Sequence, residues 1–197
     1  LLSLPNSRFT ASQIRWLLEI PAIRNRLDIE ESSVPKLCQW IEGAQIRWGL
    51  NGKHRESFGI EKGLEANTWK FGLKRMLLGY AVGTGEVFNE IEPYAEIGGL
   101  EAQTLGGLCQ LMDLLEEYAK AFNQDWDYAK WVTLLNKLLT DFFKPSDDKE
   151  RKTLESLQGA LKKWSDDCKN ANLENSLLSR NVVCDSWLSG VDEASFQ

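Results

Sequence analysis

Cationic and aromatic side chains that could contact a nucleic acid are concentrated between residues 47 and 75. This segment carries seven basic and three acidic residues, a local balance of +4, and two of the chain's tryptophans stand among its cations. Cations can neutralise phosphates, and an indole can stack on a base. The same pattern also suits two packed tryptophans with a solvated basic rim, and the sequence leaves both interpretations open. The candidate DNA contacts are Arg47, Trp48, Lys53, Arg55, Lys70, Lys74 and Arg75.

Catalytic chemistry has little support in the sequence. The only histidine, His54, lies in a polar loop without a carboxylate spaced to orient it, which favours a solvent-exposed imidazole over a general base. Residues 51–54, Asn-Gly-Lys-His, contain a Gly-Lys pair but lack the first glycine and the hydroxyl of a phosphate-binding loop. We therefore predict no catalytic residue and no cofactor site, and we expect the purified chain neither to hydrolyse ATP nor to cut DNA with magnesium present.

The four cysteines do not form a metal or disulfide motif. They stand far apart at positions 38, 109, 168 and 184 without a C-x-x-C pair, and the chain has a single histidine. Neither a zinc site nor a disulfide framework is indicated. Paired carboxylates such as Asp166-Asp167 suit solvated helix faces. No metal site is predicted, and the thiols are expected to pack as small hydrophobic groups.

The composition describes a folded and moderately acidic chain. Its formal net charge of −6 argues against binding nucleic acid by charge alone, whereas 43% apolar residues and eight tryptophans favour a packed core. Its apolar runs are far shorter than the roughly 20 residues of a membrane helix. We expect a cytoplasmic protein, and the opening LLSLPNSRF, without methionine, suggests a piece of a longer chain.

A helix over residues 68–81 must position the last three candidate cations. Counted at about 100° per residue, one apolar stripe contains Trp69, Leu73, Met76, Leu77 and Tyr80, while Phe71 and Leu78 lie opposite. Gly72 and Gly79 fall about 20° apart around the axis and mark a strip where another backbone can come close, which would explain two poor helix formers within a helix. The predicted core residues are Trp40, Trp69, Leu73, Met76 and Tyr80.

The remaining pattern is also helical, so the predicted fold class is all-α, an irregular multi-helix domain. Strand is expected only as short pieces near residues 45–65 and 86–97. Helices around 105–122 and 126–143 are expected to pack antiparallel, because both carry apolar residues at helical spacing and a short connection joins them. We predict one helical domain over 1–197, with sub-lobes 1–98 and 99–197 as its internal division. Further helices are predicted over 11–18, 21–27, 33–43, 145–171 and 178–188. Thr10 and Gln13 are expected to form a capping box at the first of them, and Asp147 lies near the start of the fourth.

Several long segments resemble the RecC family, the exodeoxyribonuclease V gamma subunit of RecBCD. The resemblance is detailed from Leu4 to about Phe143 and looser beyond, where the helical pattern persists. Because the matching segments occur in the family's order, the resemblance is specific. They are LPNSRFTASQIRWLLEIPAIRNRLDI, QWIEGAQIRWGL, NTWKFGLKRMLLGYA and DWDYAKWVTLLNKLLTDFF.

The resemblance implies a fold and a set of partners. It implies an interior segment like the 2B-type helical insertion of superfamily 1 helicases, in a chain that has lost its ATP-binding motifs. RecB and RecD, double-stranded DNA ends and unwound single strands are the implied partners, and the ATP- and magnesium-dependent motors and nuclease lie on the partner subunits. The complex acts in double-strand break repair and homologous recombination, where RecC holds the assembly together, splits the strands and scans for Chi.

Two functions stay open at this point. One is a noncatalytic helical domain of RecC that serves as scaffold and DNA-path surface. The other is a pure protein-interaction module, whose exposed apolar strip docks a partner subunit without touching DNA.

Overall fold

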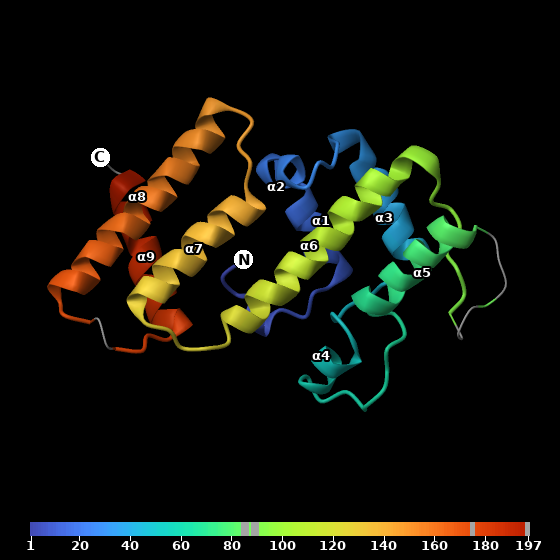
Figure 1. Ribbon diagram of the computed structural model, residues 1–197, viewed down its shortest axis with the longest axis horizontal. Coiled ribbons are helices and arrows are strands. Elements are labelled where there is room, and N and C mark those ends of the chain that lie inside the picture. The colour runs from blue at the N-terminus through green and yellow to red at the C-terminus, as the bar shows by residue number, and fades with distance from the viewer. Residues whose placement is uncertain (84–86, 88–90, 174–175, 196–197) are drawn as a thin grey trace. The chain divides into compact units, whose positions relative to one another are not determined.

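The computed structural model describes residues 1–83, 87, 91–173 and 176–195, and its regular structure is helical (Figure 1). Nine α-helices and three short 3-10 helices account for it in these ranges, and the one extended pairing with both partners described is an isolated bridge between Trp126 and Leu178. The all-α prediction is confirmed. Residues 45–65, where short strand was expected, form turns and one short helix, while part of the segment 86–97 lies outside the described residues.

The chain divides into two compact units. One contains Asn6–Glu116, and the other contains Leu1–Pro5 together with Glu117–Gln197. The division therefore falls inside a helix, α6, and not after residue 98, where the sequence suggested it.

The unit Asn6–Glu116 contains the predicted contact segment. Its first helix begins at the residue that the sequence indicated, because Thr10 accepts a hydrogen bond from the Gln13 amide while the Gln13 side chain accepts one from the Thr10 amide. Pro21 opens the second helix, where a missing N–H costs nothing. Leu18, Ile23 and other fully buried side chains of these helices form the core. The helices are α1 (Ala11–Leu18), α2 (Pro21–Arg26), α3 (Val34–Gly43), α4 (Gly52–Glu56), α5 (Trp69–Val82) and the beginning of α6 (Ala102–Ala121), with the 3-10 helices Glu31–Ser33 and Gly99–Glu101.

The other unit packs the end of α6 with three further helices, α7 (Tyr128–Phe142), α8 (Asp148–Asn170) and α9 (Arg180–Ser195), and includes the 3-10 helix Leu4–Asn6 in part. The ring of Tyr118 lies 5.5 Å from that of Phe142, and the ring of Phe122 lies 5.8 Å from that of Trp131. Later residues of α6 thus meet earlier residues of α7, which is the antiparallel pairing that the sequence predicted. It is formed by the last turns of α6.

Helix α5 buries a different stripe from the one predicted. Its buried residues are Trp69, Gly72, Met76 and Gly79, so the core-facing side is rotated toward the glycines. Tyr80 is 44% exposed, and its assignment to the core is wrong. The reason is that neighbouring segments approach α5 closely at its two glycines, and this approach decides which face of the helix turns inward. The sequence pattern ranks faces by side-chain hydrophobicity and does not show such an approach.

The remaining predicted core residues are placed as follows. Trp40, Trp69 and Met76 are at most 1% exposed, whereas Leu73 is half-buried.

Tyr94 packs against two helices at positions that have no side chain. A Cβ added at Gly43 of α3 would lie 2.5 Å from Cε2 of the Tyr94 ring, and a Cβ at Gly79 of α5 would overlap the carbonyl oxygen of Tyr94. The strip predicted from Gly72 and Gly79 therefore meets a backbone at Gly79, while at Gly72 it meets the side chain of Ile46.

Substituting Gly79 with alanine is expected to lower the free energy of unfolding by about 1–3 kcal/mol, because the new methyl group must displace the backbone at Tyr94. Gly106 in α6 is the matched control: its added Cβ would meet no atom within 4 Å, so Gly106→Ala should stabilise by about 0.5–1 kcal/mol. Urea denaturation of both variants measures the difference. Equal shifts in the two would contradict the close-approach explanation.

Candidate functional site

The predicted contact segment is organised around a buried arginine, Arg55. This residue is 7% exposed, and its guanidinium donates hydrogen bonds to the carbonyl oxygens of Trp48 at 2.9 and 3.2 Å, of Ala66 at 2.7 Å and of Leu64 at 3.3 Å. Its side chain therefore joins the start and the end of the loop between α3 and α5. Burial lowers the pKa of Arg55, and the nearby carboxylate of Glu65 opposes that shift.

Asn51 and Thr68 fix the ends of this loop. The Asn51 side chain accepts the amide of His54 and starts α4, while Thr68, fully buried, accepts the amide of Phe71 and starts α5. Backbone bonds from Trp69 N to Gly49 O and from Lys70 N to Leu50 O tie α5 to the loop. The segment is thus a packed structure.

The indole of Trp48 is covered by neighbouring side chains. The guanidiniums of Arg8 and Arg55 lie over the ring at 5.7 and 4.9 Å from its centroid, and the ring of Phe58 meets it edge-on at 6.0 Å. Trp69 is 1% exposed and donates its Nε1–H to the carbonyl of Phe9 at 2.7 Å. Both tryptophans thus pack against other residues of the fold, Trp69 fully buried and Trp48 half-buried.

His54 lies between two phenylalanine rings. Its imidazole is 5.2 Å from the rings of Phe9 and Phe58, and its buried Nδ1 has no hydrogen-bond partner among the described residues. Burial lowers the pKa of His54, so the fold favours the neutral imidazole. The expected solvent-exposed loop histidine is therefore half-buried in an aromatic cluster.

Two predicted DNA contacts are used by the fold. Arg55 is occupied as described, and Arg75 donates to the carbonyls of Glu92 and Ala44 at 2.9 and 3.1 Å and pairs with the Glu92 carboxylate at 3.5 Å. The Arg75 side chain is only 12% exposed. Each guanidinium holds a loop against a helix, which leaves little of either for a phosphate.

Three exposed cations lie on or beside the loop between α3 and α5. Arg47 and Lys53 were predicted from the sequence, and both are exposed. The third, Arg8, was not predicted; it is exposed and lies over Trp48 and Phe58 at 5.7 and 5.6 Å. No local sequence signal marks Arg8, because the backbone bond from Gly49 N to Arg8 O brings it to this loop from about 40 residues away. No ion pair engages these three in the part of the chain that the structure describes.

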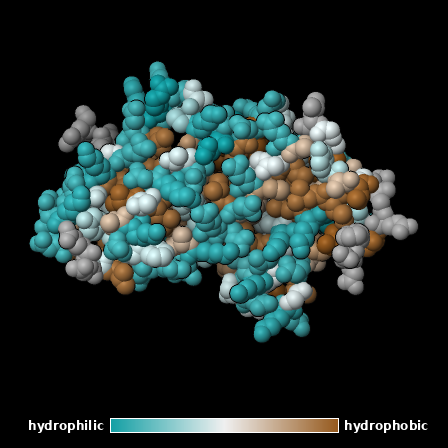
Figure 2. Space-filling model, viewed as in Figure 1, coloured by the Kyte–Doolittle hydropathy of each residue, from teal (hydrophilic) through white to brown (hydrophobic). Residues whose placement is uncertain are grey.

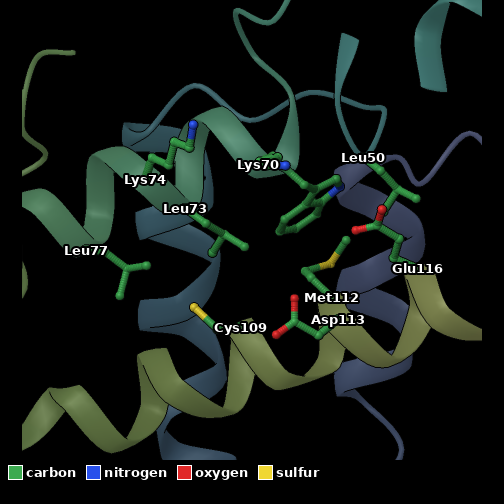
Figure 3. Close-up of a pocket in the computed structure, with 10 residues that line it drawn as sticks. Leu50, Lys70, Leu73, Lys74, Leu77, Cys109, Met112, Asp113 and Glu116 are labelled. Atoms are coloured by element: carbon green, nitrogen blue, oxygen red, sulfur yellow. The ribbon is translucent and has the colours of Figure 1, made fainter. Parts of the chain in front are cut away.

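Lys70 and Lys74, the remaining candidates, belong to a different environment, a groove between α5 and α6 (Figure 3). Its volume is about 310 Å³. Lys70, Leu73, Lys74 and Leu77 line one wall, and Cys109, Met112, Asp113 and Glu116 line the other, with Leu50 and Trp69 completing it. Figure 2 shows hydrophobic side chains reaching the surface in this region, bounded by hydrophilic ones.

The cysteines and the possible metal ligands are dispersed in the described ranges. No group of three or more histidine, cysteine or acidic side chains is placed to hold a metal ion, and the four cysteines are free thiols. Burial raises the pKa of each thiol, that of Cys109 to about 11. Of the helices described, none is both long and apolar enough to cross a bilayer.

Comparison with known proteins gives one consistent result. Residues 1–195 match the family described as RecBCD enzyme subunit RecC fourth domain. The RecBCD enzyme subunit RecC of Escherichia coli is 34% identical over 151 residues, 76% of this chain and 13% of that protein. RecC of Buchnera aphidicola from Acyrthosiphon pisum is 32% identical over 165 residues, 83% of this chain and 15% of that protein, and RecC of Haemophilus influenzae is 31% identical over 149 residues, 75% and 13%. The chain thus spans 13–15% of the length of these relatives.

Proposed function

The chain belongs to the RecC family, and from this premise we propose that it is a noncatalytic helical domain of the RecC subunit in the RecBCD helicase and nuclease assembly. In this proposal it serves double-strand break repair and homologous recombination as a scaffold beside RecB and RecD. It corresponds to the 2B-type insertion of superfamily 1 helicases. ATP and magnesium are used by the partner subunits.

The use of polar side chains supports the scaffold role. Arg55 and Arg75 are satisfied by backbone carbonyls, and Tyr118 donates to the Asp141 carboxylate at 2.8 Å. Burial and the hydrogen bond to Asp141 raise the pKa of Tyr118, so its phenol stays protonated and structural. These groups hold elements together, and none of them is poised for proton transfer or nucleophilic attack.

The observation that carries the DNA-path part of the proposal is the placement of three exposed cations. Arg47 and Lys53 lie on the loop whose carbonyls Arg55 binds, and Arg8 lies beside this loop. Cations presented on an ordered surface can neutralise phosphates without losing much freedom on binding. The contact we propose is to the DNA backbone and is independent of sequence, because the Trp48 ring is already engaged by Arg8, Arg55 and Phe58.

Reversing these charges in the assembled complex tests the DNA contact. We expect Arg8→Glu, Arg47→Glu and Lys53→Glu each to weaken binding to a forked DNA end, and to reduce the slope of log affinity against log salt by about one unit per lost phosphate contact. Lys149→Glu and Lys152→Glu, exposed on α8, are the matched controls and should leave the slope unchanged. Fluorescence anisotropy over a salt series makes the measurement. Identical slopes in the two sets would remove DNA contact from the proposal.

The interaction module remains the second candidate, and the α5–α6 groove is the observation that favours it. The groove combines exposed apolar surface at Leu77 with acidic side chains at Asp113 and Glu116, an environment that disfavours phosphate. Reversals of Arg8, Arg47 and Lys53 that disrupt subunit assembly but leave DNA affinity and its salt slope intact would favour this candidate.

A further inference from the structure

The walls of the α5–α6 groove present the same helical spacing. Lys70, Leu73, Lys74 and Leu77 follow i, i+3, i+4 and i+7 on α5, and Cys109, Met112, Asp113 and Glu116 follow it on α6. Positions with this spacing share one face of a helix. Each helix therefore turns one continuous face into the groove, and the two faces oppose each other along its length (Figure 3).

The groove has an apolar end and a charged end. Because the two helices run in opposite directions, Leu73 and Leu77 lie toward Cys109, while Lys70 lies toward Glu116 (Figure 3). Trp69 and Met112 are buried beneath, at 1% and 4% exposure, whereas Leu77 is 47% exposed. A large apolar side chain at nearly half exposure beside a buried apolar floor leaves surface that a further helix could cover.

The charges along the rim of the groove determine which class of partner it can bind. Lys70 and Lys74 stand on the α5 wall, and Asp113 and Glu116 stand on the α6 wall. A nucleic acid in the groove would bring its phosphates toward these two carboxylates, and repulsion between like charges would oppose its binding. An amphipathic helix suits both walls when it carries acidic residues toward α5, basic residues toward α6 and apolar residues between them.

We propose that this groove docks an amphipathic helix of a partner subunit. The helix places apolar anchors at i, i+3 or i+4 against Leu73, Leu77 and Met112, with an acidic residue facing Lys74 and a basic residue facing Asp113. The inference rests on the proposed function to the extent that the domain works within an assembly of subunits, as the name of its relatives states for them. It uses none of the three cations proposed to contact DNA.

Site-specific photo-crosslinking in the assembled complex tests the groove. A benzoylphenylalanine replacing Leu77 is expected to cross-link to a partner subunit, at a helical segment with apolar residues flanked by both charges. The control position is Tyr80, which lies on the same helix at the similar exposure of 44% and does not line the groove. Cross-links to the same chain, to a second copy or to added DNA, or equal yields at the two positions, overturn the proposal.

A second measurement does not depend on the bulky probe. Leu77→Asp is expected to weaken retention of that subunit about tenfold, the loss typical of a buried interface anchor. Cys109 lines the groove, so its alkylation by a small maleimide should be slower in the assembled complex than in the RecC chain alone, and Leu77→Asp should restore the faster rate. Unchanged retention, or equal alkylation rates in the complex and the free chain, overturns the proposal. The salt slope of DNA binding should stay normal in this variant, which separates failure of the groove from failure of the DNA contact.

Discussion

Replacing Arg55 with methionine is expected to lower the free energy of unfolding by about 3 kcal/mol, one of the two largest effects that the structure implies. Methionine keeps much of the length of the side chain but donates no hydrogen bond. The carbonyls of Trp48, Leu64 and Ala66 lose a charged donor together, and a bond to a charged group contributes roughly 1.5–3 kcal/mol when well buried. We set the expected value below the sum of the individual hydrogen-bond contributions, because these bonds are only partly buried. Equilibrium denaturation measures it.

The matched control for Arg55→Met is Arg8→Met. Arg8 also lies over Trp48, but it is exposed, so its removal should change stability by no more than about 0.5 kcal/mol. Hydrogen exchange adds a local measurement: in Arg55→Met the amides of Gly49 and Trp69, which bond across the loop, should lose protection first. Equal effects of the two substitutions would show that the loop does not depend on the buried guanidinium.

Trp69→Ala is expected to destabilise the fold by about 3–5 kcal/mol, the usual cost of emptying a large aromatic site. The indole is 1% exposed, and its loss also leaves the carbonyl of Phe9 without its donor. Trp16→Ala is the control, because Trp16 is 70% exposed on α1 and its removal should cost about 0.5 kcal/mol or less.

Thermal and chemical denaturation of the two tryptophan variants distinguish packing from surface contact. A small effect at Trp69, or one equal to that at Trp16, would contradict the assignment of Trp69 to the core. DNA binding of the folded Trp69→Ala complex should keep its salt dependence, because no phosphate contact is removed.

Local signals in the sequence predicted the helices well where capping and periodicity agreed. Residues Ala11–Leu18 form a helix with the expected capping box at Thr10. The helix predicted over 68–81 is α5, Trp69–Val82, with Thr68 as its N-cap. Asp147 caps α8. In each case the hydrogen bonds that start the helix are made within a few residues, so the sequence contains both partners.

Other features depended on contacts between distant segments. Helix α4, with five residues, is too short to show a periodic pattern. The role of Arg55 depends on backbone carbonyls up to 11 residues away. Every residue has a backbone carbonyl, so residue types do not reveal which of them will accept a hydrogen bond. Helix α9 was expected to end near residue 188 and continues to Ser195.

The DNA contacts stay a prediction. Composition pointed to a basic segment with interleaved tryptophans, but sequence could not tell which of its cations reach solvent. Tertiary contacts decide this: they engage Arg55 and Arg75 with backbone carbonyls, and they place Arg8 over Trp48. The RecC resemblance, by contrast, rested on long segments that occur in the same order as in the family, and the family match over residues 1–195 confirms it.

The two glycines that face Tyr94 constrain later sequence change in different ways. At Gly43 the obstacle is the tyrosine ring, so a smaller residue at position 94 would make room for a side chain, and the two positions can change together. At Gly79 the obstacle is the carbonyl oxygen of residue 94, which every amino acid carries. No substitution at position 94 can relieve that clash. Divergence within the family can therefore exchange Gly43 through a compensating partner, whereas Gly79 can be replaced only where the backbone around residue 94 has itself moved.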